Sequence, residues 1–513
     1  MIRVVQLLSI AIALSAISEI RAQAIHRNIV EGAVMKSHSN EPVSNASVEL
    51  KPVLEPQSYV VQSGSDGRFQ FRNIPDGEYE LSATRSGFVR AEFGKRRQSD
   101  PPLHVSVNAS GASSNLTLSM VPSAVVVGNV SSSGGEPSAA VIVRALRLTY
   151  RDGVPALRVE QTVVTDDQGN YRLFSLMPGR YYVSASLPAN SAVSASYYQS
   201  TSSIQLARVI DVAAGSTIGG INIASHFENG ITVRGKVSFT GSAASVELEP
   251  RLPMIPAAIA SSVTVDRNTG AFSIPNVFPG EYFLNAQSDG YSIRIPLEIG
   301  SATVPEIQVT IPRPVHFATN IKFESNLSNP PAISFRIHAG TPSVEEFMAL
   351  NGGLPTLSLI PGDYQITPWT DPTKAYPQSM RLGNLDVLND GLHVDPSSEG
   401  TIELVMGTHP GNLQGNVISA TGQPEPNTIV VLLPDAAHRN RVDLFKDVRT
   451  DIQGRFKVEA VPPGDYVVLS WEDIEPTAWK NAEFMKDYEK FGKPIHVDAD
   501  GRNTIQVEAI PSR

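Results

Sequence analysis

Hydrophobic and polar residues alternate with a two-residue period along most of the chain, a pattern typical of half-buried β-strands. The alternation is clearest after a short turn, rich in proline and glycine, that recurs five times. The five copies occupy residues 75–81, 178–183, 279–284, 361–366 and 463–468. Their glycines are separated by the length of a small domain, so the chain is a tandem array of long period.

The residues of this turn predict its geometry. Proline favours the first central position of a type II turn, and glycine favours the second, where φ is positive. We therefore expect positive φ at the turn glycines, so that valine in place of Gly280 would be strained. A tyrosine begins each following strand, as in the tyrosine corner of β-sandwiches. We predict structural roles for these tyrosines, which are Tyr79, Tyr181, Tyr282, Tyr364 and Tyr466.

A second glycine lies upstream of each turn, with a large apolar residue two positions later. The pairs are Gly67 and Phe69, Gly169 and Tyr171, Gly270 and Phe272, Gly352 and Leu354, and Gly454 and Phe456. Four of these glycines, all but Gly352, close a turn that contains Asp or Asn. Such side chains bond to their own backbone, and glycine takes the left-handed position. A β-hairpin is predicted at each of these turns.

Further alternating runs complete each unit. An apolar-x-Gly-x-Val strand is predicted at 30–34, 126–130, 233–237 and 413–417. A second strand follows, as at 46–50 and 429–433, and a last one closes each unit at 116–120, 221–223, 307–311, 402–405 or 505–507. The chain is therefore predicted to be all-β.

The order of these motifs resembles the carboxypeptidase regulatory-like domain, and it is similar to Cna B-type and starch-binding-like modules. Unit one carries the pattern in Gly32, Val34, Pro42, Ala46, Val48, Leu50, Asp66, Gly67, Phe69, Phe71, Ile74, Pro75, Gly77, Tyr79, Leu81, Ala83, Gly87 and Phe88. Unit four departs from it, with Asn320 at the place of the first-strand glycine and no acidic residue in the Gly352 turn. The resemblance implies five tandem immunoglobulin-like (transthyretin-like) Greek-key β-sandwiches.

We predict unit boundaries from these motifs. They are residues 25–122 for unit one, 123–228 for unit two, 229–314 for unit three, 315–409 for the degenerate unit four and 410–513 for unit five. The joints between the units are short, which limits the motion of neighbouring units relative to each other and favours a segmented rod.

Residues 1–24 form a predicted signal peptide. Arg3 precedes an apolar run of about 14 residues, shorter than the roughly 20 needed to span a bilayer. Ala22-Gln23-Ala24 has the small-x-small pattern of a cleavage site, so the mature chain should begin at Ile25 and keep no integral membrane segment. The chain contains no cysteine, which excludes disulfides, a lipid-modified cysteine and thiolate-bound zinc. We expect a periplasmic, outer-surface or extracellular location.

One segment breaks the β pattern. Residues 475–492 predict a helix of about four turns, the one short helix of the last unit. Its stripe consists of Trp479, Phe484, Met485, Tyr488 and Phe491. The stripe is either packed on the last sandwich or a docking surface for a partner. The same two alternatives, packing on the sandwich or a docking surface, apply to Trp471 and to its counterpart Trp369 in unit four.

Signals for metal or calcium chemistry are weak. His38 and Glu41 match the His-x-x-Glu zinc pair, yet they fall in a predicted turn between strands. Residues 498–503 open like a calcium loop, but Ala509 stands where the bidentate Glu belongs, so we predict a plain turn. We predict no catalytic, cofactor-binding or metal-binding residues, and no enzyme activity.

Two functions stay open. The first is an exported structural, adhesive or protein-interaction protein of the cell envelope, as the resemblance to non-catalytic modules of surface proteins implies. The second is an array of carbohydrate-binding modules for an envelope or extracellular polysaccharide. A net charge of −10, without long runs of one sign, argues against nucleic acid as a partner. We expect the partner to be an envelope protein or a polysaccharide, and the oligomeric state is open.

Overall fold

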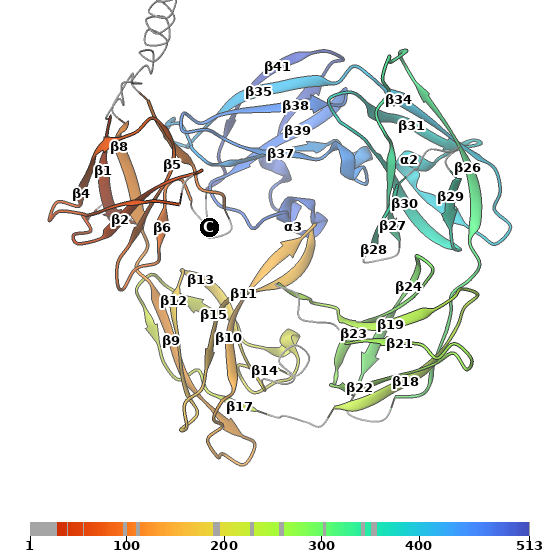
Figure 1. Cartoon of the computed structure of the whole chain (residues 1–513), viewed down its shortest axis with the longest axis horizontal. Helices are drawn as coiled ribbons and strands as arrows, with labels where there is room; N and C mark the ends of the chain where they lie inside the picture. The colour runs from red at the N-terminus through yellow and green to blue at the C-terminus, as the bar shows by residue number, and fades with distance from the viewer. Residues whose placement is uncertain are drawn as a thin grey trace, which may run out of the picture. The chain divides into compact units, whose positions relative to one another are not determined.

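The computed structural model describes residues 28–511 (Figure 1), with gaps at 38, 40, 55, 96–99, 109–112, 188–194, 226–229, 256–260, 301–303, 340–343 and 350–355. The predicted signal peptide and the start at Ile25 lie outside these residues. The chain divides into two compact units, Met1–Pro122 and Ser123–Arg513, each of which is described by itself. The described residues form five β-sandwiches, as the sequence predicts. The limits of the predicted domains stay a prediction.

The first sandwich has a sheet in the order β4–β1–β8 and a second in the order β3–β2–β5–β6, with β7 also paired to β5. The strands are β1 (Asn28–Lys36), β2 (Ser47–Pro52), β3 (Tyr59–Gln62), β4 (Arg68–Ile74), β5 (Gly77–Thr84), β6 (Ala91–Glu92), β7 (His104–Val107) and β8 (Ser113–Met120). β1 runs antiparallel to β4 and parallel to β8. Alternate residues, such as Val30, Phe71 and Leu81, fill the core between the sheets.

The second sandwich repeats this plan with sheets β12–β9–β16 and β14–β13–β10–β11, and with β17 beside β9 and β15 beside β13. Its strands are β9 (Ala124–Ser132), β10 (Ile142–Arg151), β11 (Val154–Val164), β12 (Asn170–Leu176), β13 (Gly179–Ser186), β14 (Ser196–Tyr197), β15 (Ile210–Val212), β16 (Thr217–Ile218) and β17 (Ile223–Ser225), with a 3-10 turn η2 (Ile204–Leu206). Strand β11 extends this sheet further by pairing with β20 (Met254–Ile255).

The third sandwich has sheets β22–β18–β25 and β21–β19–β23–β24. Its strands are β18 (Ile231–Ser238), β19 (Ala244–Pro250), β21 (Ser261–Thr264), β22 (Ala271–Val277), β23 (Gly280–Ser288), β24 (Tyr291–Ile299) and β25 (Ile307–Thr310).

The fourth sandwich has sheets β29–β26–β34–β31–β32 and β28–β27–β30–β33. Its elements are β26 (Val315–Phe323), β27 (Ser334–Ala339), β28 (Val344–Ala349), β29 (Thr356–Leu359), β30 (Gly362–Trp369), β31 (Tyr376–Leu382), β32 (Leu385–Asp386), α2 (Val387–Asp390), β33 (Leu392–Val394) and β34 (Thr401–Gly407). The short helix α2 was not predicted.

The fifth sandwich has sheets β38–β35–β41 and β37–β36–β39–β40. Its strands are β35 (Gly411–Ile418), β36 (Ile429–Pro434), β37 (Lys446–Arg449), β38 (Arg455–Val461), β39 (Gly464–Trp471), β40 (Lys493–Val497) and β41 (Arg502–Glu508). Its helical turns are η3 (Ala436–His438), η4 (Val442–Leu444), η5 (Ala478–Lys480), α3 (Ala482–Met485) and η6 (Glu489–Phe491). The first, second and last strands predicted for the units are confirmed here and in the other sandwiches, except that the last strand predicted at 221–223 lies instead at Ile223–Ser225 (β17).

The predicted tyrosine corners are confirmed in all five sandwiches. Each tyrosine is buried and its hydroxyl donates to the carbonyl oxygen four residues upstream. The bonds are Tyr79 to Pro75 (2.9 Å), Tyr181 to Met177 (2.8 Å), Tyr282 to Phe278 (3.0 Å), Tyr364 to Ile360 (2.7 Å) and Tyr466 to Pro462 (2.8 Å). Burial raises the pKa of Tyr181 and of Tyr282 to about 12, so these phenols stay protonated donors.

The prediction of type II turns at the corner glycines is wrong. Gly179, Gly362 and Gly464 have the positive φ that we expected, but their values of 148–156° are far from the roughly +80° of a type II turn, and Gly280 does not have a positive φ. The left-handed residue lies four positions earlier in four of the repeats. These residues are Asn73, Ser175, Asn276 and Ala460, with φ of 54–63°. They bend the strand before the turn, and Gly280 is therefore free of the strain that we expected for valine there.

The upstream glycine turns have the predicted backbone conformation, but the predicted β-hairpins are wrong, because the two strands that each turn joins, such as β3 and β4, lie in different sheets. Gly67, Gly169, Gly270 and Gly454 have φ of 71–75°. The carboxylate of Asp451 accepts from the backbone N–H groups of Gln453 and Arg455. Asp166 and Asp266 also accept from two backbone N–H groups of their own turns, and Asp66 accepts from that of Arg68. Each glycine carbonyl also accepts from a first-strand N–H at 2.8 Å, so the turn fixes where the first strand lies.

Four first-strand glycines have a role that the sequence alone did not reveal. A Cβ atom on Gly415 would lie 2.0 Å from the carbonyl oxygen of Ile505 and 2.8 Å from the ring of Phe456. A Cβ atom on Gly32 or Gly235 would likewise meet a carbonyl oxygen of the last strand and an aromatic ring of the fourth strand. One on Gly128 would meet the Ile221 carbonyl oxygen and the hydroxyl group of Tyr171. An aromatic side chain thus covers each glycine, so the two residue types are required together.

A buried ion pair lies at the joint between the fourth and fifth sandwiches. The Arg441 guanidinium is 2.7 Å from the Asp443 carboxylate, and their side chains are 7% and 8% exposed. Arg441 also donates to the carbonyl oxygen of Pro377 in β31 (3.0 Å) and to the side chain of Asn389 in α2 (3.4 Å). One guanidinium therefore binds the fifth sandwich to two elements of the fourth.

The prediction of a segmented rod is wrong for the unit Ser123–Arg513. Phe484 of the fifth sandwich packs against Tyr150 of the second, with ring centroids 5.7 Å apart. Two sandwiches separated by two others along the chain could not touch in a straight array. Short joints limit the swing of neighbours, but they do not set the direction in which successive sandwiches turn.

Candidate functional site

The aromatic segment, residues 475–491, is the first candidate site. We predicted a helix of about four turns, and this prediction is wrong. The segment instead contains the separate turns η5, α3 and η6. Asn481 ends η5 and caps α3, and its side chain accepts from the Phe484 N–H at 2.9 Å. An aromatic stripe at helical spacing predicts which residues face inward, but it does not require a continuous helix.

Most of this stripe packs on the fifth sandwich. Trp479 and Met485 are 4% and 2% exposed, and they join Trp471 and strands β36 and β39 in a hydrophobic cluster on the outer face of the sheet. Tyr488 packs edge-on against Trp471 and stacks on Phe484. Phe491 is 48% exposed. The segment is therefore largely a second core, with an edge of partly buried aromatic rings.

Trp369 in the fourth sandwich differs from its counterpart Trp471. Trp369 is 45% exposed, and the Arg336 guanidinium carbon lies 4.7 Å from the centre of its ring. Trp471 is 2% exposed. The fourth sandwich thus presents an indole ring at the surface, with a cation over it.

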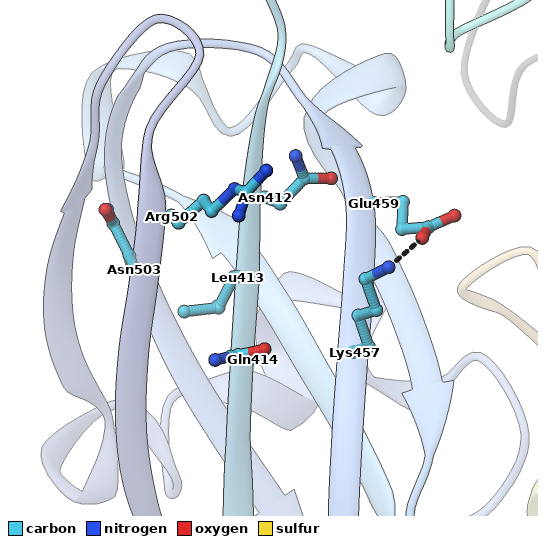
Figure 2. Close-up of a pocket in the computed structure, with 7 residues that line it drawn as sticks. All are labelled: Asn412, Leu413, Gln414, Lys457, Glu459, Arg502 and Asn503. Atoms are coloured by element: carbon cyan, nitrogen blue, oxygen red, sulfur yellow. Dashed lines mark ion pairs between the residues drawn. The ribbon is translucent and has the colours of Figure 1, made fainter.

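A polar groove of about 360 Å³ crosses the outer face of sheet β38–β35–β41 in the fifth sandwich. Its lining residues are Asn412, Leu413, Gln414, Lys457, Glu459, Arg502 and Asn503. Figure 2 shows Asn412 beside Arg502 on neighbouring strands, and an ion pair between Lys457 and Glu459 on β38. The outward positions of three adjacent strands carry amide and charged groups, so the groove offers both donors and acceptors. The sequence signal for it is polar residues at every second position of these strands.

A smaller groove of about 200 Å³ lies on the first sandwich. Its charges are largely paired with one another. Arg90 lies 3.4 Å from Glu49 and 3.3 Å from Glu92, and Lys95 also pairs with Glu92. Arg90 and Lys95 are thus held by carboxylates of the same groove, and we take the larger groove as the better candidate for a ligand.

Two histidines form matching pairs beside the corner turns of the fourth and fifth sandwiches. His393 Nδ1 lies 2.5 Å from Asp363, and His496 Nδ1 lies 2.7 Å from Asp465. Both aspartates follow a corner glycine, and both histidines stand opposite them on the paired strand. The hydrogen bond to the aspartate raises the pKa of each histidine.

We expect His496 to titrate above its ordinary value of 6.5. Because the folded pKa is raised, the pair stabilises the fold most at a pH below the unfolded value, and this contribution is lost as the pH rises through the folded pKa. Proton NMR of the imidazole measures the midpoint, and Asp465→Asn should lower it. A midpoint at or below 6.5 in the unaltered chain would contradict the expectation.

The weak metal signals can be placed only in part. His38 lies outside the described residues, so the pair with Glu41 is not seen. Residues 498–501 form the predicted turn between β40 and β41, where the Gly501 N–H donates to the Asp498 carbonyl at 3.0 Å. Within the described ranges, no group of three or more His, Asp or Glu side chains is arranged to hold a metal ion. Among the same residues, no helix combines the length and apolar character needed to span a bilayer.

Comparison with protein-family models supports the resemblance for one part of the chain. Residues 29–120, which hold the first sandwich, match the model of the carboxypeptidase regulatory-like domain. This confirms the resemblance read from the motifs of unit one. Comparison with curated protein sequences gives no match.

The solved structures that match this chain include bacterial pilins and a collagen-binding protein. A streptococcal ancillary pilin is 13% identical, with 56% of this chain and 98% of that chain covered and a TM-score of 0.22. The major pilin RrgB of Streptococcus pneumoniae is 7% identical (95% and 100% covered, TM-score 0.19), and two B repeats of the Staphylococcus aureus collagen-binding protein are 12% identical (74% and 99% covered, TM-score 0.14). At these values the likenesses carry no argument about this chain.

Proposed function

We propose that this chain is an exported, non-catalytic protein of tandem β-sandwiches with a structural, adhesive or protein-interaction role at the cell envelope. The observation that supports the proposal is that the repeated residues have structural roles within their own sandwiches. The corner tyrosines donate to their own backbone, the turn aspartates cap their own turns, and the repeated glycines make room for crossing strands. The five sandwiches therefore repeat a scaffold, and loops and outer faces are left for recognition.

The predicted signal peptide supports export, and the cysteine-free composition fits a fold stabilised by its cores alone. The test is made in cells that express the chain with a C-terminal tag. The tagged protein should be recovered in the envelope fraction or the medium, and its N-terminal sequence should begin at Ile25. Recovery in the cytosol with Met1 retained would overturn export.

The second candidate is carbohydrate recognition at the polar groove of the fifth sandwich. Its amide groups and the Arg502 guanidinium suit the hydroxyl and carboxylate groups of sugars, although its lining residues include no aromatic platform. A glycan array with residues 25–513 separates the two candidates. A structural role predicts no glycan signal. A signal that is lost in Lys457→Ala and Arg502→Ala, but kept in Arg455→Ala on the same face, would establish the second candidate.

A further inference from the structure

The hairpin of β10 and β11 is longer than the corresponding hairpins of its neighbours. Its strands pair from Ile142 and Val164 to a two-residue turn at Asp152 and Gly153, with φ of 48° and 79°. Positive φ at both positions is typical of the type I′ turn, which favours Asp-Gly. In the first sandwich the pairing of β2 and β3 ends at Leu50 and Tyr59. The outer part of the longer hairpin therefore needs a partner outside the core of its own sandwich.

The hairpin tip contacts the aromatic segment through backbone and side-chain groups. Lys480 Nζ lies 2.8 Å from Asp152 Oδ1. The Asn481 amide donates to the Gly153 carbonyl at 2.8 Å, and the Thr477 hydroxyl donates to the Tyr150 carbonyl at 3.3 Å. Figure 1 shows the tip of β10 and β11 next to α3. These bonds satisfy polar groups of the hairpin turn that would otherwise form hydrogen bonds with water.

A second set of contacts surrounds the carboxylate of Glu475. It lies 3.3 Å from Arg147 and 3.6 Å from Arg158, and it accepts from the Thr149 hydroxyl at 2.9 Å. The side chains of the two arginines and Glu475 are only 14–20% exposed, so salt screens their attraction less than at an open surface. Glu475 thus brings a negative charge to two cations of the hairpin.

Aromatic packing lies between these two polar sets. The Tyr150 ring meets Phe484 edge to face, and Phe484 stacks on Tyr488 with centroids 4.9 Å apart. Burial, together with the nearby Glu475 carboxylate, raises the pKa of Tyr150. The partly buried edge of the aromatic segment is therefore covered by a tyrosine of the hairpin.

Two residues indicate that the fit is specific. Thr477 has a φ of 58°, which is a costly left-handed conformation for a β-branched residue. This conformation places its hydroxyl between the Tyr150 carbonyl and the Gly153 N–H. A Cβ atom on Gly153 would lie 2.8 Å from Cβ of Lys480. The strained residue and the close approach both lie at the contact with the hairpin.

We propose that the aromatic segment is a docking site whose occupant is the tip of hairpin β10–β11 of the same chain. The resulting clasp joins residues 147–158 to residues 475–484 and fixes the second sandwich to the fifth. It is an interaction within the chain that the sequence motifs do not predict, and it does not depend on the proposed envelope role. The two sandwiches are therefore held at one separation.

The chain has no native cysteine, which makes a distance measurement direct. Spin labels attached at Gln168→Cys and Lys490→Cys report the separation of the two sandwiches by pulsed electron paramagnetic resonance. The labelled chain should give a single narrow distance peak. Glu475→Lys places a third cation beside Arg147 and Arg158, and the peak should be lost to a broad distribution.

The matched control is Glu483→Lys, which makes the same change of charge on the same segment, where Glu483 pairs with Lys486. This variant should keep the narrow peak. Asp152→Lys provides a second opening variant whose change lies in the second sandwich, so that it leaves the fold of the fifth intact. A broad distribution in the unaltered labelled chain, or a narrow peak retained in both opening variants, would overturn the proposal.

Discussion

Replacing Arg441 by alanine should lower the stability of the fourth and fifth sandwiches by about 3–5 kcal/mol, the range for breaking a buried ion pair by removing one partner. The change leaves the Asp443 carboxylate buried without its guanidinium, and it removes the bonds to Pro377 and Asn389. Since these bonds cross the joint, both sandwiches should be affected.

Tryptophan fluorescence during urea unfolding measures this effect selectively. The three tryptophans of the chain, Trp369, Trp471 and Trp479, lie in the fourth and fifth sandwiches. The control is Lys374→Ala, which removes an exposed ion pair to Asp371 and should cost at most about 1 kcal/mol. Equal midpoints for the two variants would show that the buried pair contributes no more than a surface pair.

The second large effect is expected for Gly235→Ala in the third sandwich. The new Cβ would lie 2.4 Å from the Ile307 carbonyl oxygen and 2.5 Å from the Phe272 ring. Strands β18 and β25 must then move apart, because neither the backbone nor the buried ring can yield alone. Overpacking of this kind costs about 1–3 kcal/mol or more.

Hydrogen exchange followed by mass spectrometry detects this change, since the third sandwich contains no tryptophan. Peptides that cover β18 and β25 should exchange faster in Gly235→Ala. Gly300→Ala in the same sandwich is the control, because nothing lies within 4 Å of its added Cβ. If exchange in β18 is the same in the two variants, the close approach does not control stability.

The sequence predicts the local structure well because that structure is decided by near neighbours. The tyrosine hydroxyl reaches a carbonyl only four residues away, and the turn aspartates bond within their own turn. Alternation of apolar residues defines the strands for the same reason. The error at Gly280 has a local cause too, since a left-handed residue four positions earlier, Asn276, already redirects the chain.

Contacts between distant residues were not predictable in this way. The pairing of Glu475 with Arg147 depends on how successive sandwiches are oriented, and no periodic pattern in the sequence predicts this orientation. The sequence left open whether the aromatic stripe is core or surface. Trp479 and Met485 are buried, whereas Phe484 packs against Tyr150 of another sandwich. The polar groove was missed because alternating polar residues occur on the outer face of any sheet, whether or not it is hollow.

The clasp changes how mechanical tension would pass through the unit Ser123–Arg513. A pull applied between the second and fifth sandwiches has two parallel routes, the covalent chain through the third and fourth sandwiches and the clasp itself. While the contacts of Glu475 and Lys480 hold, the clasp and the covalent route share the load. The third and fourth sandwiches would bear the full load only after the hairpin has been pulled free.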